Sequence, residues 1–143
     1  MADKHSVAIV IWDRGAGRVL SVLRPNTPDD ELPGLWGLPA VTLRPGEDPP
    51  VGAVRCGREK LGLEVAPVAV MGEMEAERPS GRICLTLVEA RALTWPPRLP
   101  ERSPEIKKTL YDAWAWKHPE ELRPTADAGS ICCRLLLERI ESG

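Results

Sequence analysis

The sequence lacks phenylalanine altogether and holds one tyrosine and two histidines. His5 lies near the N-terminus and His118 directly precedes a proline, so we expect both at the surface and expect no histidine-based catalysis. No serine stands in a Gly-x-Ser-x-Gly nucleophile elbow, which argues against serine hydrolase chemistry. Because the interior still needs large side chains, most of the five tryptophans are expected in the core.

Long hydrophobic runs and a strong charge imbalance are also missing. No apolar run approaches the roughly 20 residues that cross a membrane, and the N-terminus lacks the apolar core of a signal peptide. A net charge of -2 and a pI near 5.8 provide no basic surface for a nucleic acid. Without a break in composition, residues 1–143 are predicted to form one domain, soluble and cytoplasmic.

Cysteines are few and show no paired metal-ligand spacing. The vicinal pair Cys132 and Cys133 cannot easily form a bridge within a helix, so free thiols in a reducing compartment are expected. Core packing is the interpretation we favour for this pair, and a redox role is the alternative.

The stretch from Arg44 to Leu63 is the most informative part of the chain. Gly46 predicts a turn, and the two prolines that follow Glu47 and Asp48 suit the first turn of a helix, where a missing N–H costs little. Gly62 predicts the end of that helix, because glycine readily adopts the left-handed conformation found there. We therefore predict a helix over residues 49–61.

Two faces of this helix can be predicted from helical spacing. One is an apolar stripe of Val51, Val54 and Leu61. The other collects residues at i, i+3 and i+4, namely Cys56, Glu59 and Lys60. This second face is the candidate active surface, at which a phosphate or a metal would bind.

The stretch resembles the Nudix box, the signature of hydrolases that cut nucleoside diphosphates linked to another moiety. Four of its fixed points match in register: Glu47, Arg55, Glu59 and Gly62, which is followed by the apolar Leu63. Four positions depart from it: the opening glycine is Val41, the glutamate after the arginine is Cys56, the apolar position is Gly57, and the second glutamate of the closing pair is Lys60. The box is therefore degenerate.

The resemblance implies that helix carboxylates hold divalent cations on a pyrophosphate. Glu59 would be the main remaining ligand for Mg²⁺ or Mn²⁺, bound weakly, with Arg55 and Glu47 as its support. Cys56 is a poor ligand for a hard cation. Lys60 could repel the cation, contact a phosphate in its place, or simply be a solvated surface lysine.

The rest of the chain predicts a mixture of strands and helices. A hairpin is expected from residues 6–12 and 18–24, and a second from 65–74 and 83–93 with a turn over 75–82. Residues 105–110 are expected to enter a strand at 111–116, and residues 127–140 to form a helix capped by Asp127. The resemblance covers nearly the whole chain and implies an α/β protein, a Nudix-like α/β/α sandwich with a mixed central sheet.

Other residues could complete the site, and the sequence does not choose among them. The family often adds an acidic residue from outside the box, for which the pool is Glu73, Glu75, Glu77, Glu89, Glu101 and Glu105. Trp36, Trp95, Trp114 and Trp116 could stack on a base.

Three functions stay open from the sequence. The first is a metal-assisted hydrolase of a nucleoside diphosphate derivative or nucleotide, with impaired activity. The second is a catalytically inactive module that binds a nucleotide for regulation. The third is an interaction domain whose homodimer is its purpose.

Overall fold

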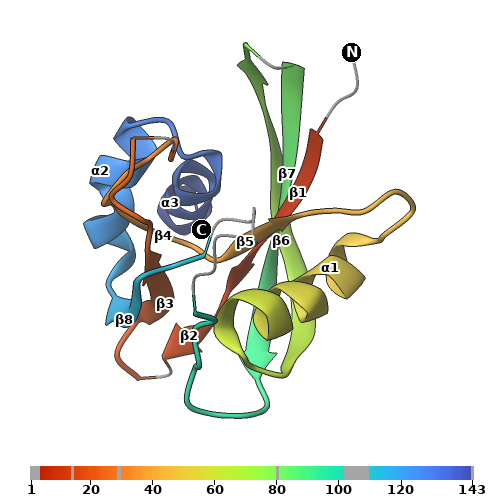
Figure 1. The fold of residues 1–143 in the computed structure, drawn as a ribbon, viewed down its shortest axis with the longest axis vertical. Helices are drawn as coiled ribbons and strands as arrows, with labels where there is room; N and C mark the ends of the chain where they lie inside the picture. Colours follow the sequence, from red (N-terminus) through yellow and green to blue (C-terminus); the bar gives the residue numbers. More distant parts are fainter. Residues whose placement is uncertain (1–3, 14, 29, 80, 102–109, 143) are drawn as a thin grey trace.

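The computed structural model describes residues 4–13, 15–28, 30–79, 81–101 and 110–142. Its strands form two sheets (Figure 1). The first has the order β5-β1-β7-β6 and contains β1 (Lys4–Val10), β5 (Ala40–Thr42), β6 (Val65–Arg78) and β7 (Gly81–Ala92). Because β1 runs parallel to β7 while the other pairs are antiparallel, this sheet is mixed, as predicted.

The second sheet is antiparallel and is built around β3 (Arg18–Leu23). Its other strands are β2 (Trp12–Asp13), β4 (Trp36–Gly37) and β8 (Ala113–Lys117). The predicted hairpin of residues 6–12 with 18–24 is therefore correct only near its turn, where β2 pairs with β3. The residues before Ile11 do not pair with β3. They form β1, which lies in the first sheet between β5 and β7.

Helices cover both faces of the mixed sheet, and alternation along β1 shows the layers. Val7, Ile9 and Ile11 face a core that includes α1 (Pro49–Cys56), whereas Ala8 and Val10 face a core that includes α3 (Ile131–Ser142). A one-turn 3₁₀ helix, η2 (Pro119–Leu122), and the short α2 (Arg123–Asp127) lie on the α3 side. This is the predicted α/β/α sandwich (Figure 1).

Several predicted boundaries are wrong. The second hairpin extends further than expected, because β6 and β7 pair up to Arg78 and Gly81 and leave a much shorter turn than 75–82. Asp127 ends α2 instead of capping a helix, because Gly129 with a φ of 117° separates α2 from α3. Most of the predicted strand entry, residues 105–110, lies outside the described residues.

The helix predicted over residues 49–61 is confirmed in extent but not in type. Its last turn, η1 (Gly57–Leu61), is π-helical, and Gly62 ends it in the left-handed conformation with a φ of 63°. A Cβ atom on Gly62 would lie 2.6 Å from the Arg98 carbonyl oxygen, so glycine is needed there for space as well as for conformation. None of the helices in the described part of the chain has the length and apolar character needed to cross a membrane.

Candidate active site

The site begins at the turn before α1, where local hydrogen bonds fix Glu47. The Glu47 backbone N–H donates to the Arg44 carbonyl oxygen at 3.0 Å, and the Arg44 backbone N–H donates to Glu47 Oε1 at 3.0 Å. Gly46 makes this turn possible with a φ of 76°. The turn holds the Glu47 carboxylate against the first turns of the helix.

Arg55 joins the two predicted carboxylates. Its Nε and Nη2 donate to the two oxygens of Glu47 at 2.9 and 2.8 Å, a bidentate pair, and its Nη1 donates to Glu59 Oε1 at 3.1 Å. Nη2 also donates to the Thr42 carbonyl oxygen at 2.7 Å. The structure therefore places Glu47, Arg55 and Glu59 together, and the four hydrogen bonds that this guanidinium gives within the described residues all go to groups between Thr42 and Glu59.

Burial differs among the three side chains. Arg55 and Glu47 are 15% and 9% exposed, whereas Glu59 is 26% exposed. The hydrogen bonds from Arg55, followed by the one from the Arg44 backbone, lower the pKa of Glu47 from 4.5 to about 2. The same pairing with Glu47 raises the pKa of Arg55. Glu47 is therefore an anion at neutral pH that pairs with Arg55, and Glu59 is the more exposed of the two carboxylates.

This pairing predicts a pH dependence of stability. Since the pKa of Glu47 is lower in the folded than in the unfolded chain, its contribution is complete above pH 4.5 and is lost as the pH falls towards about 2. Urea unfolding of the wild type and of Glu47→Gln at about pH 6, 4 and 3 measures the contribution of Glu47 to the free energy of unfolding. We expect the stability difference between the two proteins to shrink as the pH falls, and a constant difference would contradict the assignment.

A cleft of about 560 Å³ lies along this face of the helix. Its charged walls are three guanidiniums and two carboxylates: Arg44, Arg55, Arg58, Glu47 and Glu59. We call it the box cleft. Of the predicted apolar stripe, Val51 and Val54 line this cleft, Val51 being 58% exposed, and only Leu61 is fully buried. The cleft carries an excess of positive charge toward solvent.

Arg44 and Arg58 were not among the predicted site residues. The Arg44 side chain is 63% exposed and its Nη2 lies 3.4 Å from Glu59 Oε2, while Arg58 is 61% exposed and pairs with Glu64 at 2.8 Å. Arg58 follows Arg55 by three residues, so the helical spacing could have placed both on one face. No comparable signal marks Arg44, which reaches the cleft from the preceding turn.

Cys56 occupies a ligand position of the box but faces the interior. Its side chain is fully buried, and this burial raises the pKa of the thiol to about 12. The next residue explains the tight packing: a Cβ atom on Gly57 would lie 3.0 Å from the Leu63 carbonyl oxygen and from a Val65 methyl group. Gly57 therefore lets the helix approach β6 closely, and no apolar side chain fits there without movement.

Lys60 is the largest departure from the prediction. It is 5% exposed, its Nζ lies 5.7 Å from the centroid of the Tyr111 ring, and it is absent from the walls of the box cleft. Of the three alternatives for Lys60, the solvated surface lysine is therefore wrong. The phosphate contact of Lys60 stays a prediction, and Lys60 does not line the box cleft in which Glu59 lies.

The described residues do not fit a resident metal cluster. Among them, no group of three or more His, Cys, Asp or Glu side chains could hold a cation. Both oxygens of Glu47 are taken by Arg55, Cys56 is a buried thiol, and a lysine stands at the last ligand position. Of the predicted outside pool, Glu105 lies in the undescribed segment, and the described members do not line the box cleft: Glu73, Glu75, Glu77, Glu89 and Glu101.

Comparisons with known proteins identify the family and the fold. The family model described as NUDIX domain matches residues 3–131. A MutT protein from Methanosarcina mazei Go1 is 16% identical with a TM-score of 0.76, over 98% of this chain and 94% of that one. A NUDIX hydrolase from Nitrosomonas europaea is 18% identical with a TM-score of 0.74, over 99% and 90%.

A further solved structure of similar fold is a C. elegans Ap4A hydrolase, 15% identical with a TM-score of 0.66 over the full length of both chains. At these identities the likeness concerns the fold. No curated protein matches the chain.

Proposed function

The chain belongs to the Nudix domain family, and on that premise we propose that it hydrolyses a nucleoside diphosphate derivative or nucleotide, cleaving the pyrophosphate slowly. The observation that carries the proposal is the box cleft, which three guanidiniums line together with Glu59, a carboxylate that contacts Arg44 and Arg55 and is partly exposed to solvent. Arginine forks match phosphate oxygens well, so Arg44 and Arg58 suit the binding of a diphosphate. The proposal places the protein in a reducing cytoplasm, and its four free cysteines support this location.

The cation of such a reaction would belong to the substrate. Nudix hydrolases generally use divalent metals, and Mg²⁺ is commonly bound through one or two carboxylates together with substrate phosphates. Glu59 is the one carboxylate that the box cleft offers to a nucleotide bound to Mg²⁺ or Mn²⁺. Glu47 and Arg55 keep it in place. Turnover is slow in this proposal because a single carboxylate replaces a cluster.

The test is hydrolysis of a panel of nucleoside diphosphates, nucleoside triphosphates and dinucleoside polyphosphates, with Mg²⁺, with Mn²⁺ and with chelator. We expect metal-dependent turnover that falls at least about tenfold in Glu59→Gln, the loss that a group acting in the transition state commonly causes. Glu120→Gln is the matched control, because it also removes an exposed, arginine-paired carboxylate but lies in η2, outside the lining of the cleft. Equal loss in both variants would contradict the role of Glu59.

A second function is favoured by the burial of Cys56 and Lys60 at two ligand positions of the box. With those positions turned inward, the arginines of the box cleft could bind a nucleotide without any hydrolysis. Absence of turnover, together with an increase in the melting temperature by a nucleotide in chelator, would replace the hydrolase proposal with this one.

A further inference from the structure

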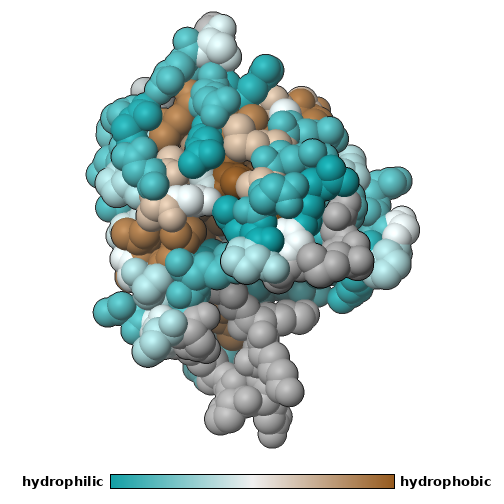
Figure 2. Space-filling model, turned by 90° about the horizontal axis from the view of Figure 1, so that it is seen from above, coloured by the Kyte–Doolittle hydropathy of each residue, from teal (hydrophilic) through white to brown (hydrophobic). Residues whose placement is uncertain are grey.

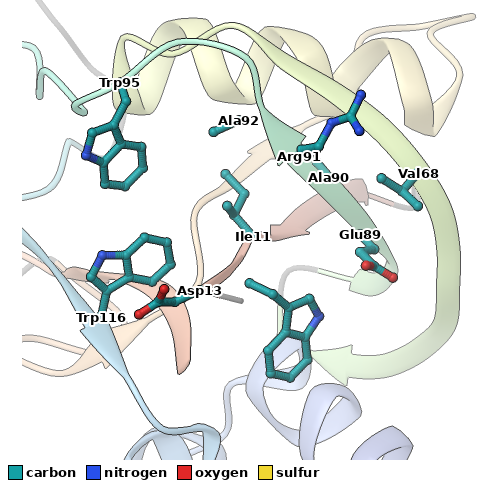
Figure 3. A pocket seen from close by; sticks show the side chains of 10 residues that line it. Ile11, Asp13, Val68, Glu89, Ala90, Arg91, Ala92, Trp95 and Trp116 are labelled. Carbon is teal, nitrogen blue, oxygen red and sulfur yellow. The ribbon is translucent and has the colours of Figure 1, made fainter. Parts of the chain in front are cut away.

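A second pocket lies between the ends of the two sheets, and its volume is about 330 Å³. Three of the five tryptophans line it, Trp12, Trp95 and Trp116, together with three charged residues, Asp13, Glu89 and Arg91. We call it the tryptophan pocket. In Figure 3, Trp95 and Trp116 lie on one side of the opening and Glu89 on the other.

Trp95 is exposed and yet held in place. It is 48% exposed, whereas Trp12, Trp36, Trp114 and Trp116 are packed against the cores. Its ring stacks on Trp116 with centroids 5.4 Å apart and an interplanar angle of 13°, and it meets Trp114 edge-on, also at 5.4 Å. A fixed indole with one side open is a stacking platform for a planar ring, at little cost in conformational entropy.

Hydrogen bonds tie the Trp95 loop to the end of the box. The Glu64 backbone N–H donates to Thr94 Oγ1 at 3.0 Å, and the Leu93 N–H donates to the Glu64 carbonyl oxygen at 2.7 Å. Glu64 also pairs with Arg58, a wall of the box cleft. One residue, Glu64, thus connects the arginine wall of the cleft to the residue next to Trp95. These contacts link a wall of the box cleft to the loop that carries Trp95.

The polar groups of the pocket indicate which ring it would take. Asp13 is already paired with Arg18, which leaves Glu89 as the carboxylate opposite the indoles, and Arg91 adds a guanidinium that can donate to a ring carbonyl of any base that has one. The selection among such bases therefore depends on Glu89. A carboxylate accepts hydrogen bonds and donates none. It therefore favours a ring that presents N–H groups, such as guanine with its ring N–H and exocyclic amino group. Uracil, which has no amino group, fits less well.

We propose that the tryptophan pocket is the base subsite of the ligand whose phosphates bind in the box cleft, and that it selects an amino-bearing base, guanine over uracil. This inference rests on the proposed function. Trp95 supplies the stacking face and Glu89 accepts from the edge of the base. Figure 2 shows one face of the molecule, on which hydrophobic patches lie among hydrophilic residues. The residues that line the tryptophan pocket are shown in Figure 3.

The experiment measures binding of GDP, UDP and inorganic pyrophosphate by isothermal titration calorimetry, in chelator so that turnover does not interfere. We expect GDP to bind more tightly than UDP, and Trp95→Leu to weaken GDP binding by about 5- to 150-fold, as the loss of one stacked base does. Pyrophosphate binding should not change. Leu93→Ala, which alters an exposed residue of the same loop outside the pocket, should bind all three as the wild type does.

Two outcomes separate this inference from the function on which it rests. If GDP and pyrophosphate bind and Trp95→Leu binds GDP as tightly as the wild type, the base subsite is overturned and the proposed function stands. If neither binds to the wild type and the nucleotide panel shows no turnover with Mg²⁺ or Mn²⁺, the box cleft is not a phosphate site and both proposals fall. Glu89→Gln tests the selection: an unchanged ratio of GDP to UDP affinity would overturn it.

Discussion

Replacing Lys60 by glutamate is expected to lower the free energy of unfolding by about 3–5 kcal/mol, the usual cost of leaving an uncompensated charge in a protein interior. This substitution restores the residue that the Nudix box has at that position. In this protein, however, Lys60 is 5% exposed and lies over the ring of Tyr111, beside the fully buried Cys56. A carboxylate there would lose its hydration and would face the ring that attracts a cation. Urea unfolding near neutral pH measures the change.

Lys60→Met is the matched control, since it keeps a long unbranched side chain and removes the charge. We expect it to cost clearly less than Lys60→Glu, because a neutral side chain tolerates burial. We also expect Lys60→Glu to leave metal-dependent hydrolysis no faster than in the wild type. A stable Lys60→Glu protein, within about 1 kcal/mol of the wild type, would show that this side chain is solvated after all.

The register of the box could be predicted from the sequence, but the faces of its helix could not. Counting residues placed Glu47, Arg55 and Glu59 correctly, because turn and helix-end signals at Gly46 and Gly62 are local. Helical spacing then assumed 3.6 residues per turn through residue 61. In the structure the predicted spacing of four residues still places Cys56 with Lys60 and Arg55 with Glu59. What the spacing could not show is that the face of Cys56 and Lys60 packs inward, while Arg55 and Glu59 line the cleft.

Gly57 shows why the close packing of this helix against β6 could not be predicted from the sequence. In the sequence, Gly57 is only a weak helix former within a helical pattern. It lowers helix stability by about 1 kcal/mol relative to alanine. The reason for glycine lies in β6 and the strand entry, where Leu63 and Val65 come within 3.0 Å of the missing Cβ. Such a contact depends on tertiary packing, and local propensity carries no information about it.

The same distinction applies to the rest of the fold. Alternation and turn signals predicted the strands of the second hairpin, since pairing between consecutive strands is local. The division of the first hairpin between two sheets depends on β1 pairing with β7, more than 70 residues later in the chain. Likewise, nothing in the sequence distinguishes the exposed Trp95 from Trp114 and Trp116, because its exposure follows from the arrangement of a loop over β8.

Replacing Arg55 by alanine is expected to lower the free energy of unfolding by about 2–3 kcal/mol, because the hydrogen bonds it gives to charged and partly buried groups are lost together. Glu47, only 9% exposed, would keep a single described hydrogen bond, from the Arg44 backbone, and the Thr42 carbonyl oxygen would lose its donor. Glu59 would lose the group that orients it, so hydrolysis should fall as well. Urea unfolding and the nucleotide panel measure the two effects.

Arg58→Ala is the matched control, because it removes the same side chain from the next turn of the helix. Its partner Glu64 is 47% exposed and Arg58 itself 61%, so their pair lies in water and its loss should leave stability almost unchanged. The difference between the two variants then measures what the buried position of Arg55 adds. Equal stability of Arg55→Ala and Arg58→Ala would mean that the Glu47, Arg55 and Glu59 contacts do not hold the box together, and the site would lose its framework.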